Sequence, residues 1–113
     1  MNGDGYAELI AGGGPGGGPR VLAVDGRGLI QGGSGNAIPV ANFFAGDVSN
    51  RGGIRVTVKD LDGDARADLV VGAGTRAGSR VTAYYGRDLT TGGTAEAFDF
   101  DAIPGFTGGV FVG

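Results

Sequence analysis

The feature that most constrains this chain is an internal repeat with a spacing of about 60 residues. Residues 2–26 and 62–86 align without a gap and are identical at 11 of 25 positions, several of them glycines. A later match, between residues 52–56 and 108–112, has a spacing of 56, so the second repeat has lost about four loop residues. Repetition at this period is typical of proteins in which similar units stack on one another. The chain is therefore predicted to contain two copies of one supersecondary unit.

Each repeat contains four runs that are typical of short β-strands, rich in β-branched and apolar residues. No stretch shows a sustained 3.6-residue periodicity, and 27 glycines in 113 residues interrupt every candidate helix, so we expect no helices. Four short antiparallel strands per repeat describe one blade of a β-propeller. In the complete copy the expected strands are residues 53–59, 67–73, 79–85 and 96–102.

An acidic nonapeptide lies between the first two of these expected strands. It carries aspartates at its first, third, fifth and ninth positions, which are Asp60, Asp62, Asp64 and Asp68. So many like charges destabilise a short loop unless a cation lies among them, and oxygen ligands without sulfur or imidazole favour calcium. The loop is not an EF-hand, because its glycine is fourth rather than sixth and strands flank it. A calcium site is predicted; the alternative is an Asp/Gly turn that solvates its charges without a metal.

The chain resembles the FG-GAP/VCBS repeat of integrin α-subunit propellers and of many bacterial surface proteins. The resemblance rests on residues 60–74, which read Asp-x-Asp-Gly-Asp-x-x-x-Asp-Leu-Val-Val-Gly-Ala-Gly, and on residues 79–86, which read Ser-Arg-Val-Thr-Ala-Tyr-Tyr-Gly. It covers essentially the whole chain and implies one blade per repeat, with calcium in the loop that joins the innermost strand to the second. It also implies a ligand set, namely the side chains of Asp60, Asp62, Asp64 and Asp68 and the backbone carbonyl of Arg66.

Two departures from the family pattern concern metal binding. Ala65 replaces the usual glycine, and if the backbone there needs positive φ, alanine costs on the order of 1 kcal/mol and weakens binding. The first copy of the loop is incomplete, because the counterpart of Asp60 would precede Met1. We therefore expect weaker calcium binding at that copy, or none. Its ligands would be Asn2, Asp4, the backbone carbonyl of Tyr6, and Glu8.

The repeats divide the chain into three parts. Residues 1–52 would supply strands two to four of one blade, residues 53–107 a complete blade, and residues 108–113 the inner strand of a next blade. That inner strand and the second strand expected at residues 6–12 both lack a partner, and exposed edges invite pairing with another chain. Head-to-tail pairing gives a ring if the rotation closes. We expect a homo-oligomeric propeller, a trimer for six blades or a tetramer for eight; the alternative is a monomeric fragment of a longer array.

Two kinds of side chain recur at equivalent places in the repeats. Arg20 and Arg80 each follow a glycine-rich turn and precede a strand. We expect each to form an ion pair or hydrogen bonds with the adjacent loop, the alternative being an anion- or sugar-binding residue on each blade. Aromatic residues recur late in each repeat and are expected to pack between blades rather than to form a ligand platform: Phe43, Phe44, Phe98 and Phe100.

Composition argues against several function classes. The net charge of −3 and the absence of a basic stripe argue against nucleic acid. No long apolar span is present, which argues against membrane insertion. An enzyme is not expected, because there is no histidine and no cysteine. The G-x-G-x-x-G match at residues 12–17 leads into a strand, whereas a dinucleotide site needs a helix there.

The expected function is that of a calcium-binding propeller module that acts as a binding or adhesion scaffold, with the calcium in a structural role. Weak calcium loops fill at the millimolar calcium found outside cells, and this agrees with the family resemblance in favouring an extracellular or cell-surface location. Two alternatives stay open. One is a lectin-like propeller that binds a glycan, and the other is a purely structural piece of a longer array with no ligand of its own.

Overall fold

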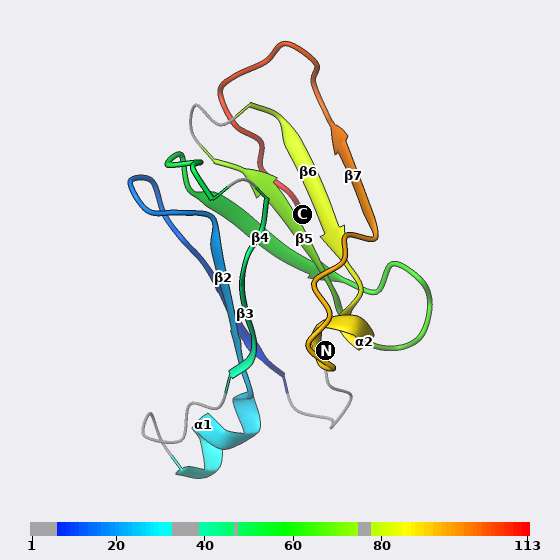
Figure 1. The fold of residues 1–113 in the computed structure, drawn as a ribbon. Helices are drawn as coiled ribbons and strands as arrows, with labels where there is room; N and C mark the ends of the chain where they lie inside the picture. The colour runs from blue at the N-terminus through cyan, green and yellow to red at the C-terminus, as the bar shows by residue number, and fades with distance from the viewer. Residues whose placement is uncertain (1–6, 33–38, 47, 75–77) are drawn as a thin grey trace.

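The computed structural model describes residues 7–32, 39–46, 48–74 and 78–113. In this part the chain forms two antiparallel β-sheets that face each other across a hydrophobic core (Figure 1). The first sheet has three strands in the order β1–β2–β3, and the second has four in the order β4–β5–β6–β7. The predicted all-β class is thus confirmed. The element bounds are β1 Leu9–Gly12, β2 Arg20–Val24, α1 Gly26–Gly32, β3 Pro39–Phe44, β4 Ile54–Lys59, β5 Asp68–Ala73, β6 Arg80–Tyr84, α2 Gly86–Leu89 and β7 Phe98–Asp101.

The strands of the second sheet agree with the four predicted runs to within two residues at each end. The two sheets also share their register: Leu9 lies opposite Val24 in the first sheet, as Leu69 lies opposite Tyr84 in the second. These pairs differ by the 60-residue spacing of the sequence repeat. The repeated sequence therefore produces a repeated strand arrangement. Within the described residues, the first sheet has no counterpart of β4.

The core lies between the sheets and follows from the alternation of side chains along each strand. From the second sheet, Leu69, Val71 and Tyr84 are buried in this core. From the first sheet, Val21 is fully buried and the Phe43 ring meets the edge of the Tyr84 ring at a centroid distance of 4.9 Å. Burying one such side chain stabilises the fold by about 1.5–3 kcal/mol. This contact holds the two repeats together.

The expectation that the chain has no helices is wrong, because one short helix follows the second strand of the first sheet and another follows the third strand of the second. α1 and α2 both begin at the glycine that the repeat places two residues after the end of the strand. In α2 the N–H groups of Asp88 and Leu89 donate to the Tyr85 carbonyl, and the Leu89 side chain is buried in the core. Helices of seven and four residues span about two turns or fewer. A segment of this length is too short to show a helical periodicity.

Residues 108–113, predicted as an inner strand, form no strand in this chain. They lie against β5, where the Val110 N–H donates to the Ala73 carbonyl at 2.9 Å. A single parallel bridge joins Gly108 to Gly78. A strand needs a neighbouring edge to pair with, and this segment crosses the face of the second sheet instead of extending its edge (Figure 1). We call residues 108–113 the C-terminal segment.

Only one of the four aromatic residues predicted to pack between the repeats does so. Phe43 contacts the core, whereas Phe44, Phe98 and Phe100 are 52%, 42% and 48% exposed. The reason for the last two is their register, since they lie opposite Ala83 and Val81 on the face of the second sheet that points away from the first. No sheet formed by the described residues covers that face.

Candidate metal centre

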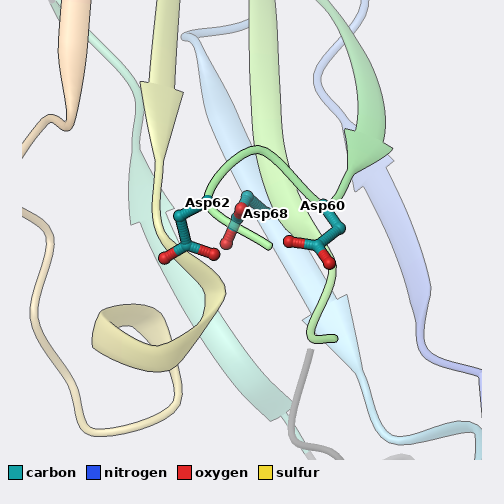
Figure 2. A group of neighbouring side chains, drawn as sticks. All are labelled: Asp60, Asp62 and Asp68. Atoms are coloured by element: carbon teal, nitrogen blue, oxygen red, sulfur yellow. The ribbon is translucent and has the colours of Figure 1, made fainter. Parts of the chain in front are cut away.

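The acidic loop is the connection between β4 and β5, which are paired up to Lys59 and Asp68. The chain must therefore reverse within eight residues, and this tight return brings distant positions of the loop together. Carboxylate oxygens of Asp60, Asp62 and Asp68 all lie within 4.8 Å of one another. Figure 2 shows Asp60 and Asp62 approaching Asp68 from either side. The structure thus gathers three of the four aspartates predicted from sequence.

Backbone N–H groups of the loop orient these carboxylates. Asp60 accepts two hydrogen bonds, from the N–H of Gly63 at 2.8 Å and from that of Ala65 at 3.0 Å. Asp62 accepts one from the Asp64 N–H at 3.2 Å. Charge-assisted hydrogen bonds of this kind fix the side-chain direction. Each carboxylate oxygen keeps a further lone pair, so the loop presents oriented, anionic oxygen donors.

The loop needs left-handed backbone at two positions. Gly63 has φ of +77° and Ala65 has φ of +66°. Ala65 is the only residue other than glycine with positive φ among the residues that the structure describes. The backbone at Ala65 therefore does need positive φ, as considered from the sequence, and the Cβ of Ala65 carries a local cost on the order of 1 kcal/mol. The conformation directs the Ala65 N–H at Asp60.

Asp68 is the most constrained member of the group, because it is fully buried. Its Oδ2 accepts from the Leu61 N–H and its Oδ1 accepts from the Gly86 N–H, both at 2.8 Å. Gly86 is the first residue of α2, so one carboxylate ties the acidic loop to the turn after β6. This second role was not predicted. The signal available in the sequence was the recurrence of glycine at Gly26 and Gly86.

Arg87 is a functional candidate that sequence reasoning missed. Its Nη1 pairs with Asp62 Oδ2 and lies 3.9 Å from Asp64 Oδ2, and its guanidinium lies over the Tyr85 ring. Partial desolvation lowers the pKa of Arg87, but Asp62, Asp88 and Asp64 together raise it above its ordinary value. Arg87 thus compensates part of the negative charge of the loop. Asp64, predicted as a ligand, lies on the Arg87 side and outside the group of three.

The remaining predicted ligands are placed as follows. Arg66 is exposed, and its N–H donates to Asp64 Oδ1 at 2.9 Å. In the first copy of the loop, Asn2, Asp4 and Tyr6 lie outside the described residues. Glu8 is half-buried directly before β1, whereas its counterpart Asp68 is fully buried and is the first residue of β5.

The recurrent arginines each bind a side chain on the neighbouring strand. Arg80 Nε donates to Asp99 Oδ1 at 2.6 Å, and Arg20 Nε donates to Asn42 Oδ1 at 2.8 Å. The hydrogen bond with Arg80 lowers the pKa of Asp99, and the same bond raises the pKa of Arg80. The predicted polar pairing is confirmed for both residues. Its location was wrong, because the partners lie on β7 and β3 rather than in the adjacent loop.

A second feature lies between the end of β3, the connection from β3 to β4, and the second sheet. A cavity of about 1240 Å³ opens there. Burial raises the pKa of Tyr84 to about 12, with smaller contributions from Glu96 and Asp99, so its hydroxyl stays protonated at neutral pH. The cavity offers charged, hydroxyl and aromatic groups; its lining includes Phe44, Asn50, Arg80, Thr82, Tyr84 and Glu96.

Comparison of the chain with protein-family models, with curated proteins and with solved structures found no match. In the part of the chain that the structure describes, neither helix has the length and apolar character that crossing a membrane requires. The acidic loop and the surfaces around it are therefore the features from which a function can be inferred.

Proposed function

We propose that the chain is a calcium-binding module made of two propeller blades, in which calcium stabilises the acidic loop of the β4–β5 hairpin. The observation that carries this proposal is the convergence of Asp60, Asp62 and Asp68 on one space, with a non-glycine residue held at positive φ in the loop that builds it. Backbone strain of this kind persists only where surrounding structure maintains it, and it concentrates at ligand sites. Calcium suits an all-oxygen, anionic donor set.

The role of the metal would be structural. Calcium supplies positive charge among carboxylates that otherwise repel one another, and the loop residues hold those carboxylates in place through their N–H groups. Asp68 couples the site to α2 through Gly86, so binding at the loop would also restrain the turn after β6. A ligand that binds only the folded state raises stability by mass action. The module would then act as a rigid binding or adhesion scaffold, and millimolar extracellular calcium favours a location outside the cell.

The test is a calcium titration by isothermal calorimetry, with thermal unfolding followed at several calcium concentrations. Asp62→Asn is expected to lower calcium affinity and to remove most of the calcium-dependent rise in melting temperature. Asp88→Asn is the matched control, because it deletes one exposed carboxylate next to Arg87 without touching the group of three. If Asp62→Asn and the unsubstituted chain titrate alike, the assignment of the site is wrong.

A second function is favoured by the cavity between the sheets. Its charged and hydroxyl groups, together with the exposed ring of Phe44, match the mixture of hydroxyls and apolar faces that a glycan presents. A lectin-like module would show saturable binding on a glycan array, and Thr82→Val would weaken it by removing one hydroxyl from the wall. An array with no saturable signal at millimolar calcium would overturn the lectin-like function, and the scaffold function would remain.

A further inference from the structure

Each sheet has two faces, and the two faces that meet in the core are not equivalent positions of the repeat. The core face of the first sheet packs against the core face of the second around the hydrophobic core. The core face of the first sheet carries Ile10, Gly12, Val21, Ala23, Ala41 and Phe43. The core face of the second sheet carries Ile54, Val56, Leu69, Val71 and Tyr84. The contact is therefore heterologous, between two surfaces of different composition.

The repeat places a counterpart of each core face on the outside of the other sheet. The outer face of the second sheet corresponds to the core face of the first, and it carries Val70, Gly72, Val81, Ala83, Phe98 and Phe100. The outer face of the first sheet corresponds to the core face of the second, and it carries Leu9, Ala11, Leu22, Val24 and Asn42. Three large side chains on these faces are exposed: Leu9 at 60%, Phe98 at 42% and Phe100 at 48%. The two outer faces are thus related in the same way as the two surfaces already in contact.

The C-terminal segment reproduces the contact that β4 makes with the first sheet. The Ile54 N–H donates to the Gly13 carbonyl at 2.8 Å, and the Val110 N–H donates to the Ala73 carbonyl at 2.9 Å. A methyl group on Gly12 would lie 3.1 Å from Val56 Cγ1, and one on Gly72 would lie 3.0 Å from the corresponding atom of Val112. The C-terminal segment therefore occupies the place on the second sheet that a first strand of a further sheet would take.

We infer that a second copy of this chain docks its first sheet on the outer face of the second sheet and pairs its β1 with the C-terminal segment. This inference rests on the proposed arrangement of the repeats as propeller blades. β4 on β5 places Val56 opposite Val71. Val112 is the counterpart of Val56 at the 56-residue spacing, and Ala11 is the counterpart of Val71 at the 60-residue spacing. The same pairing would therefore place Val112 opposite Ala11 of the second copy. The three-stranded sheet of one chain gains its missing strand from its neighbour.

The same chain cannot supply both partners of this pairing. The first sheet packs on the core face of the second sheet, whereas the C-terminal segment lies on its outer face beside Gly72 (Figure 1). The second sheet stands between β1 and the C-terminal segment. Pairing must therefore be intermolecular, which is the head-to-tail form of strand exchange that generates rings or linear arrays.

Charge placed on the outer face of the first sheet tests the interface. Ala11 is exposed in the single chain and buried in the proposed contact, so Ala11→Lys leaves the fold unchanged and opposes association. Thr91→Lys, exposed and remote from both outer faces, is the control. By light scattering, the chain and the control should have three or four times the 11.1 kDa monomer mass, and Ala11→Lys should be a monomer with the same far-UV circular dichroism. Equal masses for both variants would overturn the inference.

A cysteine pair tests the register directly, because the chain contains no cysteine of its own. Ala11→Cys with Val112→Cys should give covalent multimers on mild oxidation, and each single variant should give none beyond background. Ala11→Cys with Thr91→Cys is the out-of-register control. Multimers that form without this cross-link would show association through a different surface and overturn the docking mode.

The outcomes separate this inference from the calcium proposal. A chain that binds calcium but is monomeric overturns self-association and leaves the metal site intact. A chain that is oligomeric and cross-links in register, but does not bind calcium, overturns the metal site alone. A monomeric chain would instead favour residues from outside this sequence as the partner of the two outer faces.

Discussion

Asp68→Asn is the substitution whose cost the structure defines best. The Asp68 carboxylate is fully buried and accepts two backbone hydrogen bonds of 2.8 Å, from Leu61 and Gly86. A hydrogen bond to a charged group contributes about 1.5–3 kcal/mol. Asparagine has the same shape but keeps only one acceptor, and its amide group then faces a backbone N–H. We expect the free energy of unfolding to fall by about 2–4 kcal/mol.

The assay is urea unfolding followed by far-UV circular dichroism, since the chain has no tryptophan. A calcium chelator is present throughout, so that metal binding does not contribute to the difference. With a urea dependence of about 2 kcal/mol per molar, the midpoint should fall by roughly 1–2 M. Asp88→Asn, which removes a half-exposed carboxylate, is the matched control and should shift little.

Two results would refute this reasoning. If Asp68→Asn and Asp88→Asn have the same midpoint, the two hydrogen bonds of Asp68 carry no net stability. If the loss is absent with the chelator and appears only in a parallel unfolding series with calcium, Asp68 acts through the metal and not through the backbone. The second result would show that Asp68 stabilises the fold by coordinating calcium.

Three further predictions concern the loop and the paired strands. Ala65→Gly removes the cost of a Cβ at φ of +66°, so it should raise the free energy of unfolding by up to about 1 kcal/mol and should tighten calcium binding. Weaker calcium binding by this variant would show that the backbone at residue 65 is not strained. Arg87→Gln should tighten calcium binding several-fold, most clearly at low salt, because a cation beside Asp62 competes with the metal; unchanged affinity at low salt would contradict this. Because the pKa of Asp99 is lowered, its stabilising contribution is complete above the ordinary carboxyl value of about 3.9 and is lost as pH falls through the lower folded value. The stability difference between the chain and Asp99→Asn should therefore be constant at neutral pH and shrink below about pH 4, and a difference that grows on acidification would contradict the pairing with Arg80.

Much of the fold could be predicted because its determinants are local. Alternating β-branched residues separated by glycine-rich turns predicted β4 to β7 closely, and the repeat predicted that β1 and β2 would pair like β5 and β6. The helices were missed because α1 and α2 depend on where β2 and β6 end. After each strand, Asp25 or Tyr85 accepts the first hydrogen bonds of one or two helical turns. No periodicity exists over so short a length.

The acidic loop could be predicted in outline from the spacing of its aspartates. The separate roles of its aspartates could not be predicted, because they depend on residues far along the chain. Arg87 lies 25 residues from Asp62, and Gly86 lies 18 residues from Asp68. Both contacts exist only because β5 and β6 pair in a register that brings the β6–α2 turn beside the loop. Asp64 was assigned as an equal ligand from spacing alone, whereas in the structure it lies outside the group that Asp60, Asp62 and Asp68 form.

The strand content, the repeat and the concentration of carboxylates in one loop follow directly from residue type and spacing. The tertiary fold selects which carboxylates converge, which arginine compensates them, and which aromatic side chains enter the core. The physical reason is that burial and charge pairing depend on the face that a strand presents to its neighbour. The register of the sheets sets that face, and this is why Phe43 lies in the core while Phe98 and Phe100 lie on the outer face of the second sheet.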